Sequence, residues 1–296
     1  MSTRTAIARR GRLRAYVALT KPRIIELLLV TTVPTMVVAA RGWPSTGLVL
    51  ATLAGGSLAA GGANAINMYV DRDIDRLMGR TRNRPLVTGE VSPRSALVFA
   101  LVLEVAAFCQ LWATVNLLAA VLAVSATAFY VFVYTLWLKR TSASNIVIGG
   151  AAGAVPVLVG WAAVTGSLGL APWVLFAVVF LWTPPHFWAL AIRYRDDYAA
   201  AGVPMLPVVR SLPDTARRIV VYTLALWAVT LGFWWVGRMG GLYLGAAAVL
   251  GAAFAYKAVR LARDPSPQRA MRLFAYSISY LTLLFGALAL DQLLRS

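Results

Sequence analysis

Charged residues are scarce in this sequence. They make up 13% of its 296 residues, whereas about a quarter is usual in soluble proteins, and 60% of the residues are hydrophobic. Cysteine is almost absent: the single Cys109 excludes a disulfide within the chain, and we expect it to be a small buried hydrophobic residue. These scarcities exclude an ordinary soluble domain and a domain stabilised by its own disulfides.

Long apolar segments stand where charge is missing. Nine of them are each long enough to cross about 30 Å of hydrocarbon, and they lie at about 24–40, 47–69, 96–114, 116–137, 144–164, 170–192, 218–237, 239–261 and 271–291. The sequence therefore predicts an all-α fold, a polytopic membrane bundle of nine transmembrane helices. We expect residues 21–296 to form a single transmembrane domain. Residues 1–20 are basic and show no signal-peptide cleavage pattern, so we expect a cytoplasmic tail there.

Positive charge is distributed unevenly between the two sides of the predicted bundle. With the N-terminus in the cytoplasm, all but three of the 28 Lys and Arg residues fall on the cytoplasmic side, and the exceptions are Arg41, Arg238 and Arg295. Such an excess of Lys and Arg is typical of the cytoplasmic side of a membrane protein, so we expect a cytoplasmic N-terminus. Nine crossings, an odd number, then place the C-terminus outside. Basic loops that face the lipid bilayer account for the net charge of +17, so no nucleic-acid partner is expected.

The densest group of acidic residues follows the second apolar segment. Asn67, Asp71 and Asp75 are spaced four residues apart, so on a helix they lie on one face. Hard oxygen atoms on one face suit Mg²⁺. A second group, Asp196 and Asp197, follows the sixth segment on the same side of the membrane. The sequence predicts a metal site between the two groups; ion pairing of these aspartates with nearby arginines at the membrane surface is the alternative.

The acidic stretch and several further motifs resemble a known family. Asn67-x-x-x-Asp71-x-x-x-Asp75, followed by Arg-Thr-Arg-Asn-Arg-Pro-Leu from residue 80, is similar to the first aspartate-rich motif of the UbiA-type intramembrane prenyltransferases. The segments that resemble the haem-farnesylating branch of this family are 19–23, 67–71, 134–140, 145–153, 184–187 and 197–198. The resemblance covers nearly the whole chain, with the motifs in the family's order.

Two positions depart from the wider family pattern. The family's first motif usually has Asp directly after the Asn, where this chain has Met68. Its second motif usually has Asp four residues before Asp197, where this chain has Arg193. We therefore expect the first acidic motif to hold more of the magnesium than the second, with Asp196 as a substitute ligand in the second.

The resemblance implies a reaction between farnesyl diphosphate and haem B. The farnesyl C1 becomes bonded to a haem vinyl carbon, water supplies a hydroxyl group, and haem O and diphosphate are the products, with Mg²⁺ as the cofactor. The resemblance also implies a multi-pass protein of a prokaryotic inner or plasma membrane, whose loops at about 70–95 and 193–217 cap the active site. The product would be handed to a haem A synthase or to a terminal oxidase during assembly.

The same resemblance implies roles for individual residues. The expected catalytic and metal-holding residues are Asn67, Asp71, Asp75 and Asp197. The residues expected to clamp the diphosphate are Arg23, Lys139, Arg140, Arg82 and Arg84. The aromatic residues expected near a developing allylic cation are Tyr134, Trp188 and Tyr194. His186, which follows two prolines expected to break the sixth helix, is the candidate to contact haem.

Two other functions stay open at this point. One is prenylation of another aromatic or tetrapyrrole acceptor by an enzyme of the same type. The other is transport of an anionic lipid-like substrate. Transporters hold their ionisable sites near the middle of the bilayer, whereas both acidic groups here lie at predicted helix ends, and this favours an enzyme.

Overall fold

The described chain is a bundle of helices that contains no strand. The computed structural model describes residues 3–296, and for residues 3–10 and 23–29 it describes the backbone alone. The longer helices are α1 (Thr3–Thr20), α2 (Pro22–Ala40), α3 (Thr46–Val70), α6 (Pro93–Thr114), α7 (Leu117–Ala128), α9 (Asn145–Thr165), α10 (Leu170–Arg193), α13 (Leu212–Val236), α14 (Gly241–Arg263) and α15 (Pro267–Leu293). The shorter elements are α4 (Arg72–Leu77), α5 (Pro85–Thr88), the π-helix η1 (Phe129–Leu138), α8 (Lys139–Thr141), α11 (Arg195–Ala200) and α12 (Leu206–Val209). The prediction of an all-α fold is confirmed.

Eight stretches of the described chain are long and apolar enough to cross a membrane. They are α3, α6, α9, α10, α13, α14, α15 and the continuous run Leu117–Thr141 that joins α7, η1 and α8. The first predicted segment coincides with α2, whose described apolar part, Val30–Ala40, is shorter than a span. Residues 3–20, expected as a tail, are helical and form α1, which packs against α3 and α5.

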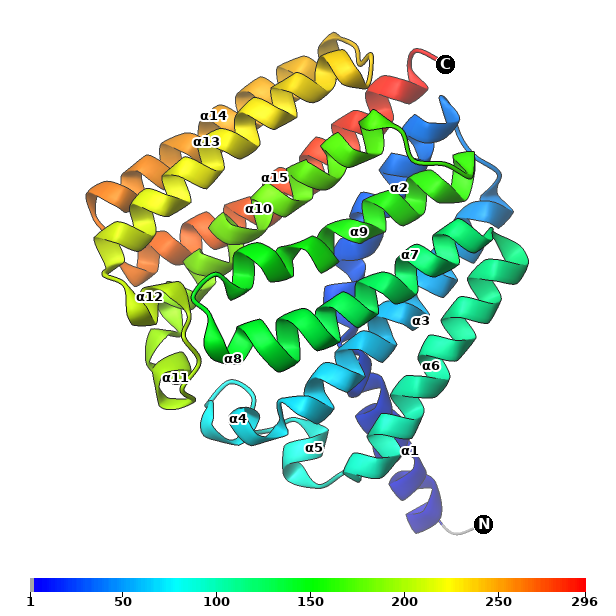
Figure 1. The fold of residues 1–296 in the computed structure, drawn as a ribbon, viewed down its shortest axis with the longest axis vertical. Helices are drawn as coiled ribbons and strands as arrows, with labels where there is room; N and C mark the ends of the chain where they lie inside the picture. Colours follow the sequence, from blue (N-terminus) through cyan, green and yellow to red (C-terminus); the bar gives the residue numbers. More distant parts are fainter. Residues whose placement is uncertain (1–2) are drawn as a thin grey trace.

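The two acidic motifs meet at one end of the bundle. Figure 1 shows α4 and α5 at the same end as α11 and α12, and we call this the acidic end. Helix α1 also lies toward this end, whereas the C-terminus lies at the opposite one (Figure 1). The loops expected at about 70–95 and 193–217 therefore contain short helices that lie together.

Helix α10 is the central helix of the bundle. It packs against α9, α13 and α15, and 67% of its apolar stretch is buried, a larger share than in any other candidate span. Pro184 and Pro185 lie inside α10, so the prediction that they break the helix is wrong. Proline lacks a backbone N–H, but neighbouring helices and local adjustments can compensate for the freed carbonyl groups in a membrane bundle.

The helix that carries the first acidic motif bends at Asp71. Helix α3 ends at Val70, Asp71 has φ −82° and ψ 4°, and α4 begins at the next residue. Helical hydrogen bonds continue through the bend, from Asp71 N to Asn67 O at 2.9 Å and from Asp75 N to Asp71 O at 2.8 Å. The four-residue spacing therefore keeps its helical register although the motif is not one straight helix.

The helix next to this motif contains the π-helical stretch η1. π-Helical turns frequently occur at functional sites, and here Thr135 Oγ1 donates to the Tyr130 carbonyl five residues earlier at 2.9 Å.

Cys109 lies on α6, at the edge of the bundle in Figure 1, and is exposed. The expectation of a buried cysteine is wrong: only 22% of the apolar stretch of α6 is buried, and Cys109 does not lie on the buried face that Ala100, Ala107 and Leu111 form.

Candidate active site

A cavity of about 700 Å³ lies inside the bundle. Its charged and amide-bearing lining toward the acidic end includes Lys21, Asn67, Asp75, Arg80, Arg84 and Lys139. Its apolar lining comes from several helices, among them α3, α7, α9, α10 and α15, and includes Leu53, Ala59, Val159 and Leu281. This division suits a ligand with a charged head and a long apolar tail.

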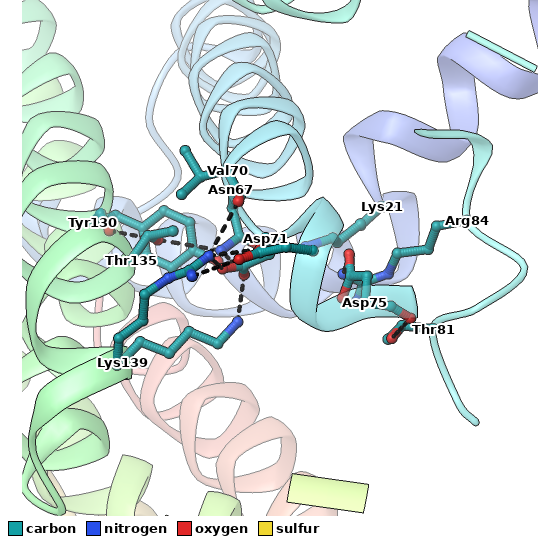
Figure 2. A network of polar contacts seen from close by, with 12 residues as sticks. Lys21, Asn67, Val70, Asp71, Asp75, Thr81, Arg84, Tyr130, Thr135 and Lys139 are labelled. Carbon is teal, nitrogen blue, oxygen red and sulfur yellow. Dashed lines mark hydrogen bonds and ion pairs between the residues drawn. The ribbon is translucent and has the colours of Figure 1, made fainter. Parts of the chain in front are cut away.

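Asn67 and Asp71 lie at the centre of a hydrogen-bond network at the acidic end (Figure 2). Asn67 Nδ2 donates to Asp71 Oδ2 at 2.7 Å and to Thr135 Oγ1 at 3.2 Å, which fixes the orientation of the amide. Lys139 Nζ donates to the same Asp71 oxygen. Asp71 is fully buried, and a buried carboxylate requires such compensation.

Lys21 joins this network from the turn between α1 and α2. Its Nζ donates to Asn67 Oδ1 at 2.9 Å. Its backbone has φ 51°, in the left-handed region where a residue other than glycine is strained, and such strain is common at functional sites. Burial, followed by the nearby positive charges of Arg84 and Lys139, lowers the pKa of Lys21 to about 7. Lys21, Arg84 and Lys139 therefore lie close together near the carboxylates of Asp71 and Asp75.

Asp75 is buried near Asp71 but has a different cation as its partner. Arg84 Nη1 donates to Asp75 Oδ2 at 2.6 Å, and Thr81 Oγ1 donates to the Asp75 carbonyl oxygen at 2.9 Å. The loop after α4 therefore folds back over the motif and brings Arg84 to the cavity (Figure 2). Arg82 of the same loop is exposed and is not among the residues that line the cavity.

Asp73 and Arg140 form a separate pair at the surface of the acidic end. Arg140 Nη1 and Nη2 donate to the two carboxylate oxygens at 2.7 and 2.8 Å. These hydrogen bonds lower the pKa of Asp73 to about 2. Arg140 Nη2 also lies 3.9 Å from Asp71 Oδ1. Arg140 therefore touches the edge of the network and is not among the residues that line the cavity.

The second acidic motif lies beside the first but does not complete its ligand set. A Cβ at Gly79 would lie 3.7 Å from Asp197 Oδ1, so Asp197 contacts the loop after α4. Asp196 and Arg193 are exposed. In the part of the chain that the structure describes, no three His, Cys, Asp or Glu side chains lie close enough to hold a metal ion together. The expected trio of Asp71, Asp75 and Asp197 is therefore not assembled in this structure.

The first motif by itself has the donors that a magnesium ion requires. Asp71 Oδ1 is buried and has no hydrogen-bond partner among the described residues, and such an oxygen is costly to leave unpaired. Asn67, Asp71 and Asp75 offer hard oxygen atoms, and one or two protein carboxylates are usual where substrate phosphates complete the coordination. These residues fit a magnesium ion that binds together with a phosphate ligand.

Two tyrosines of η1 line the cavity next to the acidic motif. Tyr130 and Tyr134 stack with their ring centroids 5.4 Å apart. A Cβ at Gly149 of α9 would lie 2.3 Å from Tyr134 Cδ2, so the ring packs directly on the glycine backbone. The structure therefore brings Tyr134 to the cavity and holds it there.

The other two predicted aromatic residues lie elsewhere. Trp188 is buried in the core and packs edge-to-face against Tyr222 of α13, with centroids 5.3 Å apart. Tyr194 lies under the Arg80 guanidinium, which is 5.5 Å from its ring centroid. Neither aromatic residue is among those that line the cavity. Of the pair Tyr194 and Arg80, it is Arg80 that lines the cavity, and sequence reasoning did not single it out.

His186 lines the cavity on the α10 side. Its Nδ1 lies 2.7 Å from Ser277 Oγ, and Ser277 Oγ donates its one hydrogen to the Phe274 carbonyl oxygen at 2.6 Å. Nδ1 must therefore carry the proton and donate it, because the serine hydroxyl has no second hydrogen. The Trp182 and Phe274 rings stack on the imidazole, at centroid distances of 4.2 and 4.5 Å. Nε2 has no hydrogen-bond partner among the described residues, so its lone pair is available to a ligand.

Sequence reasoning missed the lining residues Lys21, Arg80 and Tyr130, and its prediction for Arg23 falls on a side chain outside the described residues. Lys21 and Arg80 stand inside the motifs that carried the family resemblance, so that resemblance was the available signal. Tyr130 precedes Tyr134 by four residues, and this spacing was the signal for a second ring on the same side. The side chain of Arg23 lies outside the described residues.

Comparison with known proteins identifies close relatives along the chain. The model of the UbiA prenyltransferase family matches residues 28–285. A Protoheme IX farnesyltransferase of Frankia alni is 56% identical over 285 residues, which covers 94% of this chain and 98% of that protein. One of Clavibacter sepedonicus is 55% identical over 284 residues and covers 95% and 93% respectively.

Solved structures share the fold at much lower identity. A digeranylgeranylglyceryl phosphate synthase structure aligns with a TM-score of 0.79 at 17% identity, covering 95% of this chain and 99% of that one. A UbiA homolog from Archaeoglobus fulgidus, bound to GPP and Mg²⁺, aligns with a TM-score of 0.63 at 18% identity, covering 93% and 99%. The arrangement of helices in this chain is therefore one that solved proteins also adopt.

Proposed function

The chain belongs to the UbiA prenyltransferase family, in its protoheme IX farnesyltransferase branch, and on this premise we propose that it transfers the farnesyl group of farnesyl diphosphate to a vinyl group of haem B. The products are haem O and diphosphate. The observation that carries the proposal is the division of the cavity, which joins charged groups at the acidic end to an apolar interior that His186 lines. The diphosphate of the substrate requires the charged end of such a cavity, and its isoprenoid chain requires the apolar interior.

The cations at the acidic end hold the diphosphate. Three of these cations already donate to side-chain oxygen atoms of the first motif: Lys139 to Asp71, Arg84 to Asp75 and Lys21 to Asn67. Their ammonium and guanidinium groups can donate to phosphate oxygens from the same positions. Arg80 adds a further cation from the loop after α4. This arrangement stabilises the negative charge that develops on the diphosphate as the bond to farnesyl C1 breaks.

Asn67, Asp71 and Asp75 would hold the magnesium ion, whereas Asp197 lies beside Gly79 in the loop after α4. When bound there, Mg²⁺ supplies a Lewis acid that neutralises the leaving diphosphate. The Archaeoglobus homolog is bound to Mg²⁺ together with a prenyl diphosphate, which supports a similar requirement here. We infer that the first motif carries most of the metal binding, since Asp71 and Asp75 are buried and Asp196 is exposed.

Tyr130 and Tyr134 face the charge that develops on the farnesyl group. Their stacked rings line the cavity beside the acidic motif, and aromatic faces attract a cation. The apolar walls from α3, α9 and α15 keep water away from the isoprenoid chain. The reaction therefore takes place at the boundary between the charged and the apolar parts of the cavity.

His186 is the proposed contact to the haem iron. Ser277 keeps the proton on Nδ1 and leaves Nε2 as the electron-pair donor, which is the arrangement of an imidazole that binds a metal. Trp182 and Phe274 hold the ring in place by stacking. The iron contact would fix the porphyrin relative to the acidic end and so select which vinyl group reacts.

The membrane environment follows the charge asymmetry of the sequence. We propose that the acidic end faces the cytoplasm, where most Lys and Arg residues lie, and that the protein resides in the cell membrane of a bacterium. Haem O is too apolar to leave the bilayer readily, which suits direct transfer to a haem A synthase or a terminal oxidase under assembly. A transport function is not proposed, because the family relationship and the groups at the acidic end both support an enzyme.

One assay tests the proposal. Purified protein is incubated with haem B, farnesyl diphosphate and Mg²⁺, and haem O is followed by chromatography and mass spectrometry, with chelated and Asp71→Asn samples as controls. We expect haem O in the complete reaction and little in either control. Prenylation of another aromatic or tetrapyrrole acceptor, with haem B left unmodified, would mean that the acceptor is wrong while the enzyme class is right.

A further inference from the structure

Glu104 is an acidic residue near the midpoint of α6, a candidate span of 22 residues. Of the acidic residues in the sequence, Glu26, Glu104 and Asp291 fall inside predicted spans, and Glu26 and Asp291 lie at or close to span ends. A carboxyl group at the middle of a membrane is costly and usually functional. The mechanism described above does not use it.

The carboxyl group of Glu104 packs between α3 and α7. A Cβ at Gly62 of α3 would lie 2.4 Å from Glu104 Oε1, so the absence of a side chain there makes room for the carboxyl group. Thr127 Oγ1 of α7 donates to Glu104 Oε1 at 3.2 Å. Glu104 Oε2 is buried and has no hydrogen-bond partner in the described part of the chain. The surrounding residues thus leave one carboxylate oxygen unused.

Thr127 connects this carboxyl group to the cavity. Thr127 and its neighbours Ala63 and Ala126 line the cavity wall, and Glu104 lies behind Thr127. Because Thr127 donates its hydroxyl proton to Glu104, the lone pairs of Oγ1 are free to accept a proton from a group in the cavity. Gly62 precedes Asn67 by five residues, or about 7.5 Å along α3, so the pair lies deeper than the acidic motif. A farnesyl chain whose diphosphate is bound at the acidic end would enter the cavity in this direction.

We propose that Glu104, acting through Thr127, accepts the proton that is released when water adds to the haem vinyl group; this rests on the proposed function. The C1–O bond of farnesyl diphosphate breaks and both electrons leave with the diphosphate. The vinyl π electrons form the new bond between C1 and the terminal vinyl carbon, which leaves a cation on the inner vinyl carbon.

Water completes the reaction at that cation. A lone pair of the water oxygen forms the C–O bond, and the protonated alcohol loses one proton to Thr127 Oγ1. Thr127 passes its own proton to Glu104, which ends the step as a neutral carboxylic acid. No oxidant or reductant is needed.

The test compares variants that change proton acceptance without changing shape. The variants are Glu104→Gln and Thr127→Val, with Thr127→Ser as the matched control that keeps the hydroxyl group. The rate of haem O formation is measured in a single turnover, and the affinities for haem B and for farnesyl diphosphate are measured separately. The products are identified by mass spectrometry. For Glu104→Gln and Thr127→Val we expect haem O formation to slow on the order of 100-fold, with both affinities unchanged. Thr127→Ser, which restores the hydroxyl group, should recover most of the rate that Thr127→Val loses.

Product identity gives a second readout that a structural role would not change. If water is not deprotonated, the cation loses a proton from the neighbouring CH₂ to the leaving diphosphate, and an alkene that lacks the elements of water accumulates. Wild-type rates and products in both Glu104→Gln and Thr127→Val would overturn the proposal, as would a loss confined to substrate affinity. If Glu104→Gln does not fold, the comparison of Thr127→Val with Thr127→Ser decides. Failure of the wild-type protein to form haem O would instead reject the proposed function.

Discussion

Lys139 of α8 donates a hydrogen bond to Asp71 Oδ2, the same oxygen that accepts from Asn67 at 2.7 Å. Asp75 is held in the same way by Arg84, at 2.6 Å. Both carboxylates proposed to hold magnesium are therefore paired with cations from other segments of the chain. A divalent ion that arrives alone must displace these cations. One that arrives with a diphosphate offers them new anionic partners.

Divalent metal binding should therefore depend on diphosphate. We expect Mn²⁺ alone to bind weakly, and its affinity to rise about tenfold or more, equal to 1.4 kcal/mol or more, when inorganic diphosphate is added. In Lys139→Met, Mn²⁺ alone should bind more tightly than in wild type, because Asp71 loses a competing cation. Electron paramagnetic resonance of free and bound Mn²⁺ measures both effects. Arg76→Met removes an exposed cation at the same end and should have little effect; equal Mn²⁺ affinity with and without diphosphate would contradict the prediction.

The two neighbouring aspartates of the first motif should differ sharply. Asp71→Asn should lower haem O formation on the order of 100-fold or more, because it removes a buried carboxylate at the diphosphate site. Asp73→Asn is the matched control, since Asp73 is exposed and pairs with Arg140 at the surface of the acidic end. It should retain most of the activity. Steady-state assays at saturating substrates make the comparison, and equal losses in the two variants would argue against a metal site at Asp71.

Two glycines of α9 provide a test of Tyr134. Gly149→Ala should lower turnover by about tenfold or more, because the added Cβ would meet Tyr134 Cδ2 at 2.3 Å and must displace the ring from the cavity. Gly153→Ala adds the same atom on the same helix, where nothing lies within 4 Å. Both residues line the cavity. Turnover should be near normal in Gly153→Ala; if Gly149→Ala were equally active, the position of Tyr134 would not matter.

Haem binding should depend on Nε2 of His186. His186→Gln removes the electron-pair donor, so we expect the visible spectrum of bound haem to change and haem affinity to fall by about tenfold or more. Ser277→Ala should give a smaller loss, because it removes the partner that keeps the proton on Nδ1. Spectral titration with haem B measures both, and farnesyl diphosphate affinity is the internal control. An unchanged haem spectrum in His186→Gln would exclude the iron contact.

Asp291 should matter for stability and not for catalysis. Its carboxylate accepts from Gly240 N at 2.6 Å and from Tyr243 N at 3.1 Å, at the start of α14. Asp291→Ala leaves these buried donors unpaired, which costs about 1–3 kcal/mol, so the unfolding temperature should fall. Activity below that temperature should be retained, because the C-terminal end of α15, which carries Asp291, lies opposite the acidic end (Figure 1). Asp264→Ala, an exposed aspartate, is the control for thermal unfolding.

Local spacing and hydropathy were sufficient for much of the fold. Apolar segment lengths predicted the candidate spans, because a membrane imposes a length on each helix whatever its neighbours are. The prolines of α10 and the cysteine of α6 were misjudged for the opposite reason. Whether a proline interrupts a helix and whether a side chain faces the core both depend on the helices packed around it.

The sequence by itself determined which residues share the acidic end, since the four-residue spacing of Asn67, Asp71 and Asp75 is a property of one helix. Tertiary structure alone decided their partners. The pairing of Asp71 with Lys139 joins residues 68 positions apart, and the contact of His186 with Ser277 joins residues 91 positions apart. Hydrogen bonds across helices depend on which faces meet when the bundle packs, and no local pattern records that. The spacing of the acidic motif was readable along the chain, whereas packing set both the cations that pair with its carboxylates and the tautomer of His186.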